Sequence, residues 1–382
     1  MRRISNTKPG RVRWWVDGKA TSRLDALMAD PDHVLQGSGS VARRRVGRKH
    51  LFRVEGAPGE PALYVKVFPP PRGLAGLGYL VRPSKARHEA SAARRTAGRG
   101  FDVALPIAIA EERRFGLLQR SFSVVQELPA RDLRAILTDP ATGGEDRRAL
   151  VEAFASLVRR LHDAGIDQDD PLPNNVLVAD ERRLVLIDFE RCRVGGALGA
   201  RRWHLLAKLH RDDLGVTYTD RLRFLRAYLG TAADRPARRV AWRRIRAALR
   251  RVRATAARHA ARSAFRPGRH LAHAGEGWVV LSREELPVQR LSLGTRGARE
   301  VWVRLHQLER LRLPVLRPVR LGRDWVELED PGAELPIEER ESRIRRARRK
   351  FRGYGEFVAK GEWTVTPEGA KLRDPRAFRL DL

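Results

Sequence analysis

The chain has 382 residues and one cysteine, with 42% hydrophobic and 32% charged residues and a formal net charge of +31. Its length exceeds that of most single domains, the absence of an apolar run of roughly 20 residues excludes a membrane-spanning helix, and one cysteine (Cys192) excludes an internal disulfide. The N-terminus lacks the apolar stretch of a secretory signal, so we expect a cytoplasmic protein whose arginine excess either meets an anionic partner or reflects its genome's codon usage.

The first 230 residues predict strands followed by helices. A basic lead-in covers residues 1–33. Residues 34–68 contain apolar stretches bounded by glycine and proline, which predict strands, and a helix is expected over residues 83–97. Further strands are predicted at 102–110, 121–128, 174–179 and 183–190, and further helices at 131–137, 147–164 and 201–229. This order predicts an α+β, two-lobed protein-kinase-like fold over residues 34–232, with a β-rich N-lobe and a helical C-lobe that divide near Leu128.

The last third of the chain repeats parts of this pattern weakly. Residues 233–268 predict an arginine-rich helical connector with an apolar stripe. We expect this helix to pack on the preceding lobe and leave its arginines in solvent, and contact with a membrane or a polyanion is the alternative. Residues 269–382 read as strands, a helix and more strands, an α+β extension. One interpretation is a degenerate second kinase-like half; the other is an unrelated α+β appendage.

The strongest chemical signal is DDPLPNNVLV followed by LVLIDFE. Phosphoryl transfer from a nucleotide needs an aspartate that accepts the proton of the substrate hydroxyl, together with an asparagine and a second aspartate on Mg²⁺. Asp170 fits the first role, and Asn175 and Asp188 fit the metal roles because two short strands would bring them together. Asp169 with Asn174 has the same spacing and stays an alternative, but Asn175 directly precedes the strand.

Two further features suggest a nucleotide site. Lys66 lies within the apolar strand LYVKVF, where a charge is costly unless it is paired, and Glu89 on the next helix is its natural partner. Such a pair would hold the α- and β-phosphates of ATP. Gly37 and Gly39 are weaker candidates for a phosphate-binding turn, since glycine lets backbone amides approach a ligand.

These residues resemble the lipopolysaccharide inner-core sugar kinases, especially the kinases of 3-deoxy-D-manno-octulosonic acid (Kdo). The resemblance rests on GYLVRPSKARHEASAARR with VALPIAIA, on DDPLPNNVLV, on LIDFERCRV and on WHLLAKLHRDDL, and covers about residues 36–230. It implies the roles given above for Lys66, Glu89, Asp170, Asn175 and Asp188. Glu190 stands where that family commonly has an acidic residue in place of glycine. Gln168, Asp169 and Pro171 depart from its usual loop, and an amide at Gln168 is expected to remake a hydrogen bond that histidine usually makes.

The resemblance also implies a substrate and a location. It predicts an ATP- and Mg²⁺-dependent kinase that phosphorylates a Kdo or heptose hydroxyl on a lipid A anchor at the cytoplasmic face of the inner membrane, where arginines would meet an anionic surface. A kinase of small molecules such as aminoglycosides or choline, and a pseudokinase that acts as a binding or regulatory protein, stay open as alternatives. No motif for reading nucleic acid is present, so no nucleic-acid partner is expected.

Overall fold

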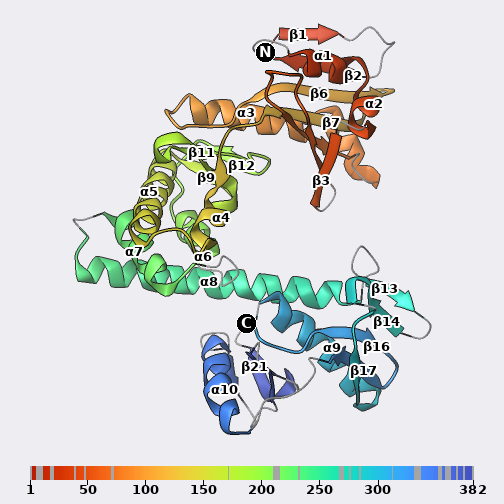
Figure 1. The fold of residues 1–382 in the computed structure, drawn as a ribbon, viewed down its shortest axis with the longest axis vertical. Coiled ribbons are helices and arrows are strands. Elements are labelled where there is room, and N and C mark those ends of the chain that lie inside the picture. Colours follow the sequence, from red (N-terminus) through yellow and green to blue (C-terminus); the bar gives the residue numbers. More distant parts are fainter. Residues whose placement is uncertain are drawn as a thin grey trace. The chain divides into compact units, whose positions relative to one another are not determined.

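The computed structural model describes two compact units, residues 1–209 with 214–238 and residues 210–213 with 239–382 (Figure 1). The boundary lies in helix α8 (Arg235–Ser263), after Arg238. The described residues are 2–5, 12–17, 21–37, 40–46, 49–69, 73–170, 172–209, 216–230, 233–265, 271–274, 277–283, 285–311, 313–330, 337–351, 355–357, 363–366, 369–372 and 375–380.

A seven-stranded antiparallel sheet forms the upper lobe of the first unit, in the order β1-β2-β6-β7-β5-β4-β3. The strands are β1 (Arg2–Ser5), β2 (Val12–Val16), β3 (Ser40–Val46), β4 (Lys49–Val54), β5 (Leu63–Phe68), β6 (Pro106–Arg114) and β7 (Leu117–Gln126). The segment expected to be a separate lead-in therefore supplies two strands of this sheet. The first residues of the expected strand region form a helix instead, because Asp30 caps it and Pro31 begins it.

Helices cover both faces of this sheet. On one face, α1 (Ser22–Ala29) and α2 (Pro31–Gln36) contribute to a core that includes Trp14 and Phe122. On the other, α3 (Lys85–Ala97) packs Ala86 and Ala90 against Phe68. Because successive side chains of a strand point to opposite faces, Lys66 shares the face of Phe68 and points toward α3.

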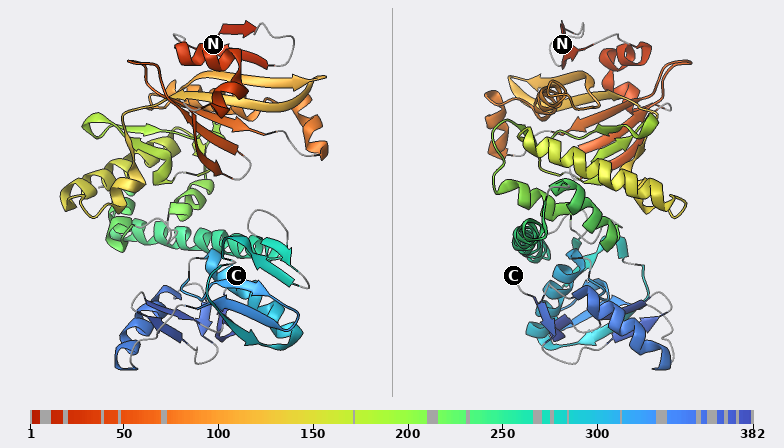
Figure 2. Two further views of the ribbon diagram at one scale, coloured as in Figure 1. Left: turned by 45° about the vertical axis from the view of Figure 1, so that its right-hand side comes forward. Right: turned by 90° about the vertical axis from the view of Figure 1, so that its left-hand side faces the viewer.

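The lower lobe of the first unit is mainly helical. Its helices are α4 (Leu133–Thr138), α5 (Gly144–Asp163), α6 (Arg201–Leu209) and α7 (Tyr218–Leu229), and its short strands are β8 (Arg131–Asp132), β9 (Ile166–Gln168), β10 (Val176–Val178), β11 (Leu184–Leu186) and β12 (Cys192–Val194). Helices α5 and α7 lie side by side (Figure 2), with the rings of Phe154 and Phe224 5.5 Å apart. The α+β class and the two-lobed kinase-like arrangement predicted from the sequence are confirmed.

The second unit combines the greater part of α8 with a five-stranded antiparallel sheet in the order β13-β14-β16-β17-β15. Its elements are β13 (Leu271–Ala274), β14 (Gly277–Val280), β15 (Val288–Ser292), α9 (Gly294–Arg310), β16 (Pro318–Leu321), β17 (Trp325–Glu329), α10 (Ile337–Phe351), β18 (Gly355–Phe357), β19 (Trp363–Thr366), β20 (Gly369–Leu372) and β21 (Phe378–Leu380). Trp302 of α9 is fully buried in the core of this unit and donates a hydrogen bond to the carbonyl of Ala264.

Short 3-10 turns complete both units: η1 (Gly73–Leu80), η2 (Pro173–Asn175), η3 (Asp180–Arg182), η5 (Leu281–Arg283) and η6 (Pro375–Ala377). Within the described ranges, no helix combines the length and the apolar character that crossing a membrane requires.

Candidate active site

Lys66 and Glu89 form a buried ion pair between the sheet and helix α3. The Lys66 Nζ lies 2.5 Å from Glu89 Oε1, and the two side chains are 15% and 3% exposed. Burial alone would lower the pKa of Lys66, but the nearby carboxylates of Glu89 and Asp188 outweigh it and raise the pKa above its ordinary value. The lysine therefore stays charged within the fold, as a binder of anions requires.

Asp188 meets two lysines just after β11. Its carboxylate accepts hydrogen bonds from Lys66 Nζ at 3.2 Å and from Lys49 Nζ at 3.1 and 3.3 Å. Burial would raise the pKa of Asp188, but these two lysines lower it below the ordinary value. Asp188 also has a φ of 63°, a left-handed conformation that non-glycine residues seldom adopt and that tends to occur at functional sites.

Glu190 adds a second carboxylate to this charged cluster. Its carboxylate accepts hydrogen bonds from Lys49 at 3.2 Å and from Lys85, at the start of α3, at 2.5 Å. The sequence alone assigned no role to Lys49 or Lys85. The available signal for Lys49 was its position, directly after the turn that joins two strands ahead of the Lys66 strand.

Hydrogen bonds to backbone carbonyls hold the loop that carries Asp170 and Asn175. Asn175 is buried, and its Nδ2 donates to the carbonyl of Asp170 at 2.8 Å. Its own carbonyl accepts from the N–H of Ile187 at 3.0 Å, so Asn175 and Asp188 lie on neighbouring segments of the β10–β11 hairpin. The carboxylate of Asp170 belongs to an exposed residue.

Asp169 differs from Asp170 in its surroundings. Its carboxylate bonds to the Arg201 guanidinium and to Lys208 Nζ at 2.9 Å, both on α6. Burial would raise the pKa of Asp169, but Lys208 and Arg201 lower it below its ordinary value. Asp169 is thus engaged in ion pairs, and its spacing partner Asn174 is exposed where Asn175 is buried.

Gln168 makes a hydrogen bond through its side-chain amide. Its Nε2 donates to the carbonyl of Ile187 at 3.1 Å, so the amide links the Asp170 loop to the residue before Asp188. His162 is buried and hydrogen-bonds through Nδ1 to the Tyr228 hydroxyl at 2.9 Å.

Of the two glycines expected to form the phosphate turn, the structure describes Gly37. Gly37 ends helix α2, and its N–H bonds to the carbonyl of His33. The hairpin of β3 and β4 pairs Ser40 with Val54 at that end and Val46 with Lys49 at its other end. The end nearest Asp188 is therefore the one with Lys49, while Gly39 lies outside the described residues.

The donor set suits a nucleotide with a hard divalent cation. Within the described ranges, no three His, Cys, Asp or Glu side chains are grouped to hold a metal ion. Mg²⁺, however, is usually held by one or two protein oxygens together with waters and nucleotide phosphates. The Asp188 carboxylate and the amide oxygen of Asn175 provide such oxygens, and Lys49 and Lys66 provide charges that suit phosphate.

Residues 79–228 match the sequence model of the Lipopolysaccharide kinase (Kdo/WaaP) family. The lipopolysaccharide core heptose(I) kinase WaaP of Pseudomonas aeruginosa is 35% identical over 158 residues, which cover 37% of this chain and 59% of that protein. The 3-deoxy-D-manno-octulosonic acid kinase of Vibrio cholerae is 32% identical over 96 residues, which cover 25% of this chain and 39% of that protein. The chain spans less than two thirds of each relative's length. The resemblance predicted from the sequence is confirmed over the matched segment.

Two solved structures are also similar to this chain. A structure described as WaaP in complex with acyl carrier protein is 28% identical, with a TM-score of 0.42, and the match covers 57% of this chain and 88% of that one. The MAP kinase LmaMPK10 of Leishmania major is 14% identical, with a TM-score of 0.31, and the match covers 53% of this chain and 66% of that one.

Proposed function

We propose that this protein transfers the γ-phosphoryl group of ATP to a Kdo or heptose hydroxyl of the lipopolysaccharide inner core. The observation that carries the proposal is the convergence of Lys66, Glu89 and Asp188 beside the loop of Asp170 and Asn175. The family match and the two curated relatives, both named as kinases of inner-core sugars, support the choice of acceptor.

In this proposal, the lysines bind the nucleotide. Lys66, oriented by Glu89, binds the α- and β-phosphates, while Lys49 at the end of the β3–β4 hairpin lies close enough to Asp188 to neutralise the outer phosphates. Asp188 and Asn175 would hold Mg²⁺, which supplies charge neutralisation between the phosphates when bound.

Asp170 takes the part of the base. The sugar hydroxyl oxygen attacks the γ-phosphorus, the bond from that phosphorus to the bridging oxygen of ADP breaks, and the hydroxyl proton passes to the Asp170 carboxylate. Two features favour Asp170 over Asp169. Asn175 is bonded to the Asp170 carbonyl, and the Asp169 carboxylate is already engaged by Arg201 and Lys208.

A lipid-anchored acceptor requires the enzyme to meet a membrane, and the upper lobe carries a surface suited to this. We call it the tip patch; its members are Leu77, Leu80, Val81, Phe115 and Leu117. Val81 is 89% and Phe115 91% exposed, which is unusual for large apolar side chains. Arg82 and Arg114 are exposed beside them. Apolar side chains bordered by cations suit an anionic bilayer surface, such as the cytoplasmic face of the inner membrane.

Helix α8 adds a second basic surface. It buries small residues such as Ala241 and Ala257 and exposes arginines at helical spacing: Arg235, Arg239, Arg243, Arg246, Arg250 and Arg258. Each charge near an anionic leaflet contributes about 1 kcal/mol of attraction. Peripheral attachment to the membrane is therefore part of the proposal.

The test is phosphoryl transfer from [γ-³²P]ATP to Kdo-lipid A and to its heptose-bearing form, with wild type and Asp170→Ala. Transfer to either lipid that falls by about 10² to 10⁴-fold in the variant supports the proposal. ATP binding without transfer to any acceptor points instead to a pseudokinase, and transfer to aminoglycosides or choline alone points to a small-molecule kinase.

A further inference from the structure

The two units share one strand order. Removing the β3–β4 hairpin from the first sheet leaves β1-β2-β6-β7-β5, and the second sheet reads β13-β14-β16-β17-β15. Helix α3 follows β5 and precedes β6 and β7 in the first unit. Helix α9 follows β15 and precedes β16 and β17 in the second unit. The paired strands β9 and β12 likewise correspond to β18 and β21, and the hairpin β10–β11 to β19–β20.

Backbone register fixes which residues correspond. Val103 forms a parallel bridge with Leu186, and Val315 forms the same bridge with Leu372. In each case, the leucine N–H bonds to the carbonyl before the valine, and the leucine carbonyl accepts from the N–H after it. Strands β6 and β16 then each begin with a proline and share a bulge directly after it.

Counting from these bridges gives the second unit's equivalents of Lys66 and Glu89. Lys66 lies opposite Ser123, and the equivalent pair is Leu291 opposite Val326. Five of the six buried positions of α3 (Ala86, Glu89, Ala90, Ala93, Thr96) match the buried positions of α9 (Ala298, Val301, Trp302, Leu305, Leu308), so Val301 replaces Glu89. The second unit thus has an apolar pair where the first has its ion pair, and the residues described between β14 and β15 form no counterpart of the Lys49 hairpin.

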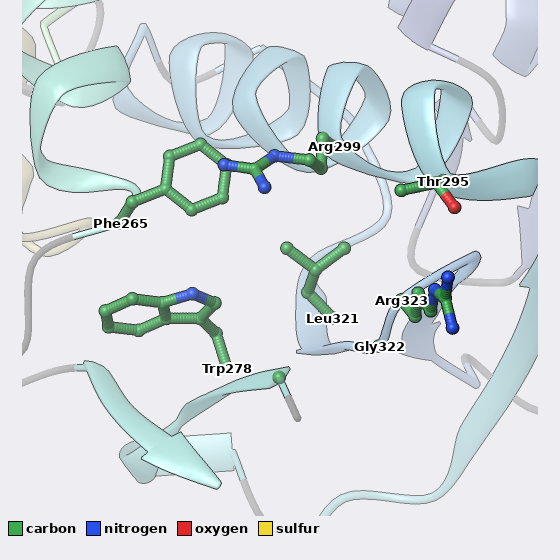
Figure 3. A pocket seen from close by; sticks show the side chains of 8 residues that line it. Phe265, Trp278, Thr295, Arg299, Leu321, Gly322 and Arg323 are labelled. Carbon is green, nitrogen blue, oxygen red and sulfur yellow. The ribbon is translucent and has the colours of Figure 1, made fainter. Parts of the chain in front are cut away.

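A cavity of about 370 Å³ opens beside α9 in this unit (Figure 3). Its apolar wall consists of Trp278, Phe265 and Leu321, with the two aromatic rings 6.3 Å apart and tilted by 70°. Arg299 extends over the ring of Phe265, and Arg323 lies on the far side of Leu321. Neither arginine has a carboxylate partner among the residues that the structure describes.

At the equivalent place in the first unit, a carboxylate neutralises the arginine. Arg87 stacks on the ring of Trp15 at 4.5 Å, and its Nε lies 3.8 Å from the carboxylate of Glu111, which is 4% exposed. By register, Trp278 is the equivalent of Trp15 and Arg299 of Arg87. Arg323 follows Leu321 as Glu111 follows Ile109, so an arginine stands where the first unit has the neutralising glutamate.

We propose that the second unit is a catalytically silent copy of the first unit's fold and that its cavity binds a phosphorylated sugar. Two arginines without carboxylate partners suit a phosphate monoester, because guanidinium groups pair with phosphate oxygens in a forked geometry. The apolar wall of Trp278 and Phe265 suits the flat face of a sugar ring, and the cavity has the volume of a small-ligand site. The sugar phosphate comes either from solution or from the headgroup of a glycolipid.

The test is calorimetric titration of the full chain with two probes, glucose 6-phosphate and detergent-dispersed lipid A, in the absence of ATP. Arg323→Ala lies on an exposed turn and Arg299→Ala on an exposed helix face, so both variants should fold. Each should weaken binding about 10- to 100-fold, the usual cost of losing a hydrogen bond to a charged group. The matched control is Arg310→Ala, an exposed arginine at the other end of α9.

Binding of either probe that both pocket variants weaken and that Arg310→Ala retains supports the proposal, and the probe that binds identifies the source. Glucose and AMP, as further titrants, should bind far more weakly than the phosphorylated sugar. The proposal would be overturned if neither probe bound, if Arg323→Ala bound the probes as tightly as wild type, or if the protein bound AMP more tightly than the phosphorylated sugar. Asp170→Asn should bind the probes like wild type. Probe binding therefore tests the cavity independently of the proposed phosphoryl transfer.

Discussion

Lys66 Nζ lies 2.5 Å from Glu89 Oε1, and both side chains are largely withdrawn from water. Taking charges out of water costs several kcal/mol per ion, which only a close partner offsets. Removing one member of the pair therefore leaves an uncompensated charge. The second unit has Leu291 and Val301 at the corresponding positions, so the fold itself does not need the pair.

We expect Lys66→Met to lower the stability of the first unit by about 3 to 5 kcal/mol and to abolish phosphoryl transfer. The double variant Lys66→Met with Glu89→Leu should recover most of that stability, because neither charge is left alone, yet stay inactive. Urea denaturation gives the stabilities and a transfer assay the activities. A double variant as unstable as the single one would contradict this account of the pair.

Much of this unit could be predicted from the sequence because its signals are local. The apolar strand around Lys66 and the hairpin between Asn175 and Asp188 follow from alternation and spacing. Lys49 could not be found in this way, because its contact with Asp188 depends on how far a hairpin extends across the lobe. Gly37 lies at the end of helix α2, in a segment that the sequence predicted to be strand, because the Asp30 cap and Pro31 that start this helix were overlooked.

The fold of the second unit was harder to predict from the sequence, because local signals in it are weak. Its likeness to the first lies in strand order and register, which side-chain patterns record poorly once residues such as Lys66 and Glu89 have been replaced. The buried stripe of α9 and the sequence around Pro318 kept a visible similarity, and the sequence AKLRDPRAFRL at the end of the chain kept a faint one.

Asp169 and Asp170 should respond differently to the same substitution. Asp170→Asn should reduce the turnover number by about 10² to 10⁴-fold with little change in stability, because the carboxylate accepts the proton. Asp169→Asn should keep most of the activity and lose about 1 kcal/mol of stability, since its partly exposed ion pairs with Arg201 and Lys208 weaken. Steady-state kinetics and urea denaturation check both. The reverse order of effects on turnover would move the base to Asp169.

Lys49 should matter for nucleotide affinity. Lys49→Ala removes a cation next to Asp188 and should weaken Mg-ATP binding about 10-fold, the effect of losing one charge-assisted contact to phosphate. Lys85→Ala is the control, because Lys85 pairs with Glu190 rather than with Asp188 and is half exposed. Titration with a fluorescent ATP analogue measures both. Equal losses in the two variants would show a general charge effect.

The tip patch should govern attachment to membranes. Phe115→Asp and Val81→Asp each replace an almost fully exposed apolar side chain by an anion, so the fold should tolerate them. We expect each to reduce binding to vesicles with 30 mol% phosphatidylglycerol about 10-fold, because apolar burial and electrostatic attraction are both lost. Transfer to a detergent-dispersed acceptor should be unchanged. Vesicle co-sedimentation measures the binding to vesicles. Undiminished binding by both variants would show that the tip patch does not contact the membrane.

His162 should make the first unit sensitive to acid. Burial, with Arg202 as a second cause, lowers its pKa from the ordinary 6.5 to about 4. Between these two values the unfolded chain takes up a proton that the folded chain refuses, so stability falls as the pH falls. By pH 5 the loss from this residue should be about 2 kcal/mol. His162→Gln can still bond to Tyr228 but cannot titrate. Urea denaturation at pH 7 and pH 5 should show a drop in stability smaller by that amount in the variant, because the acidic groups lose the same stability in both proteins. An equal drop would mean that His162 is protonated within the fold.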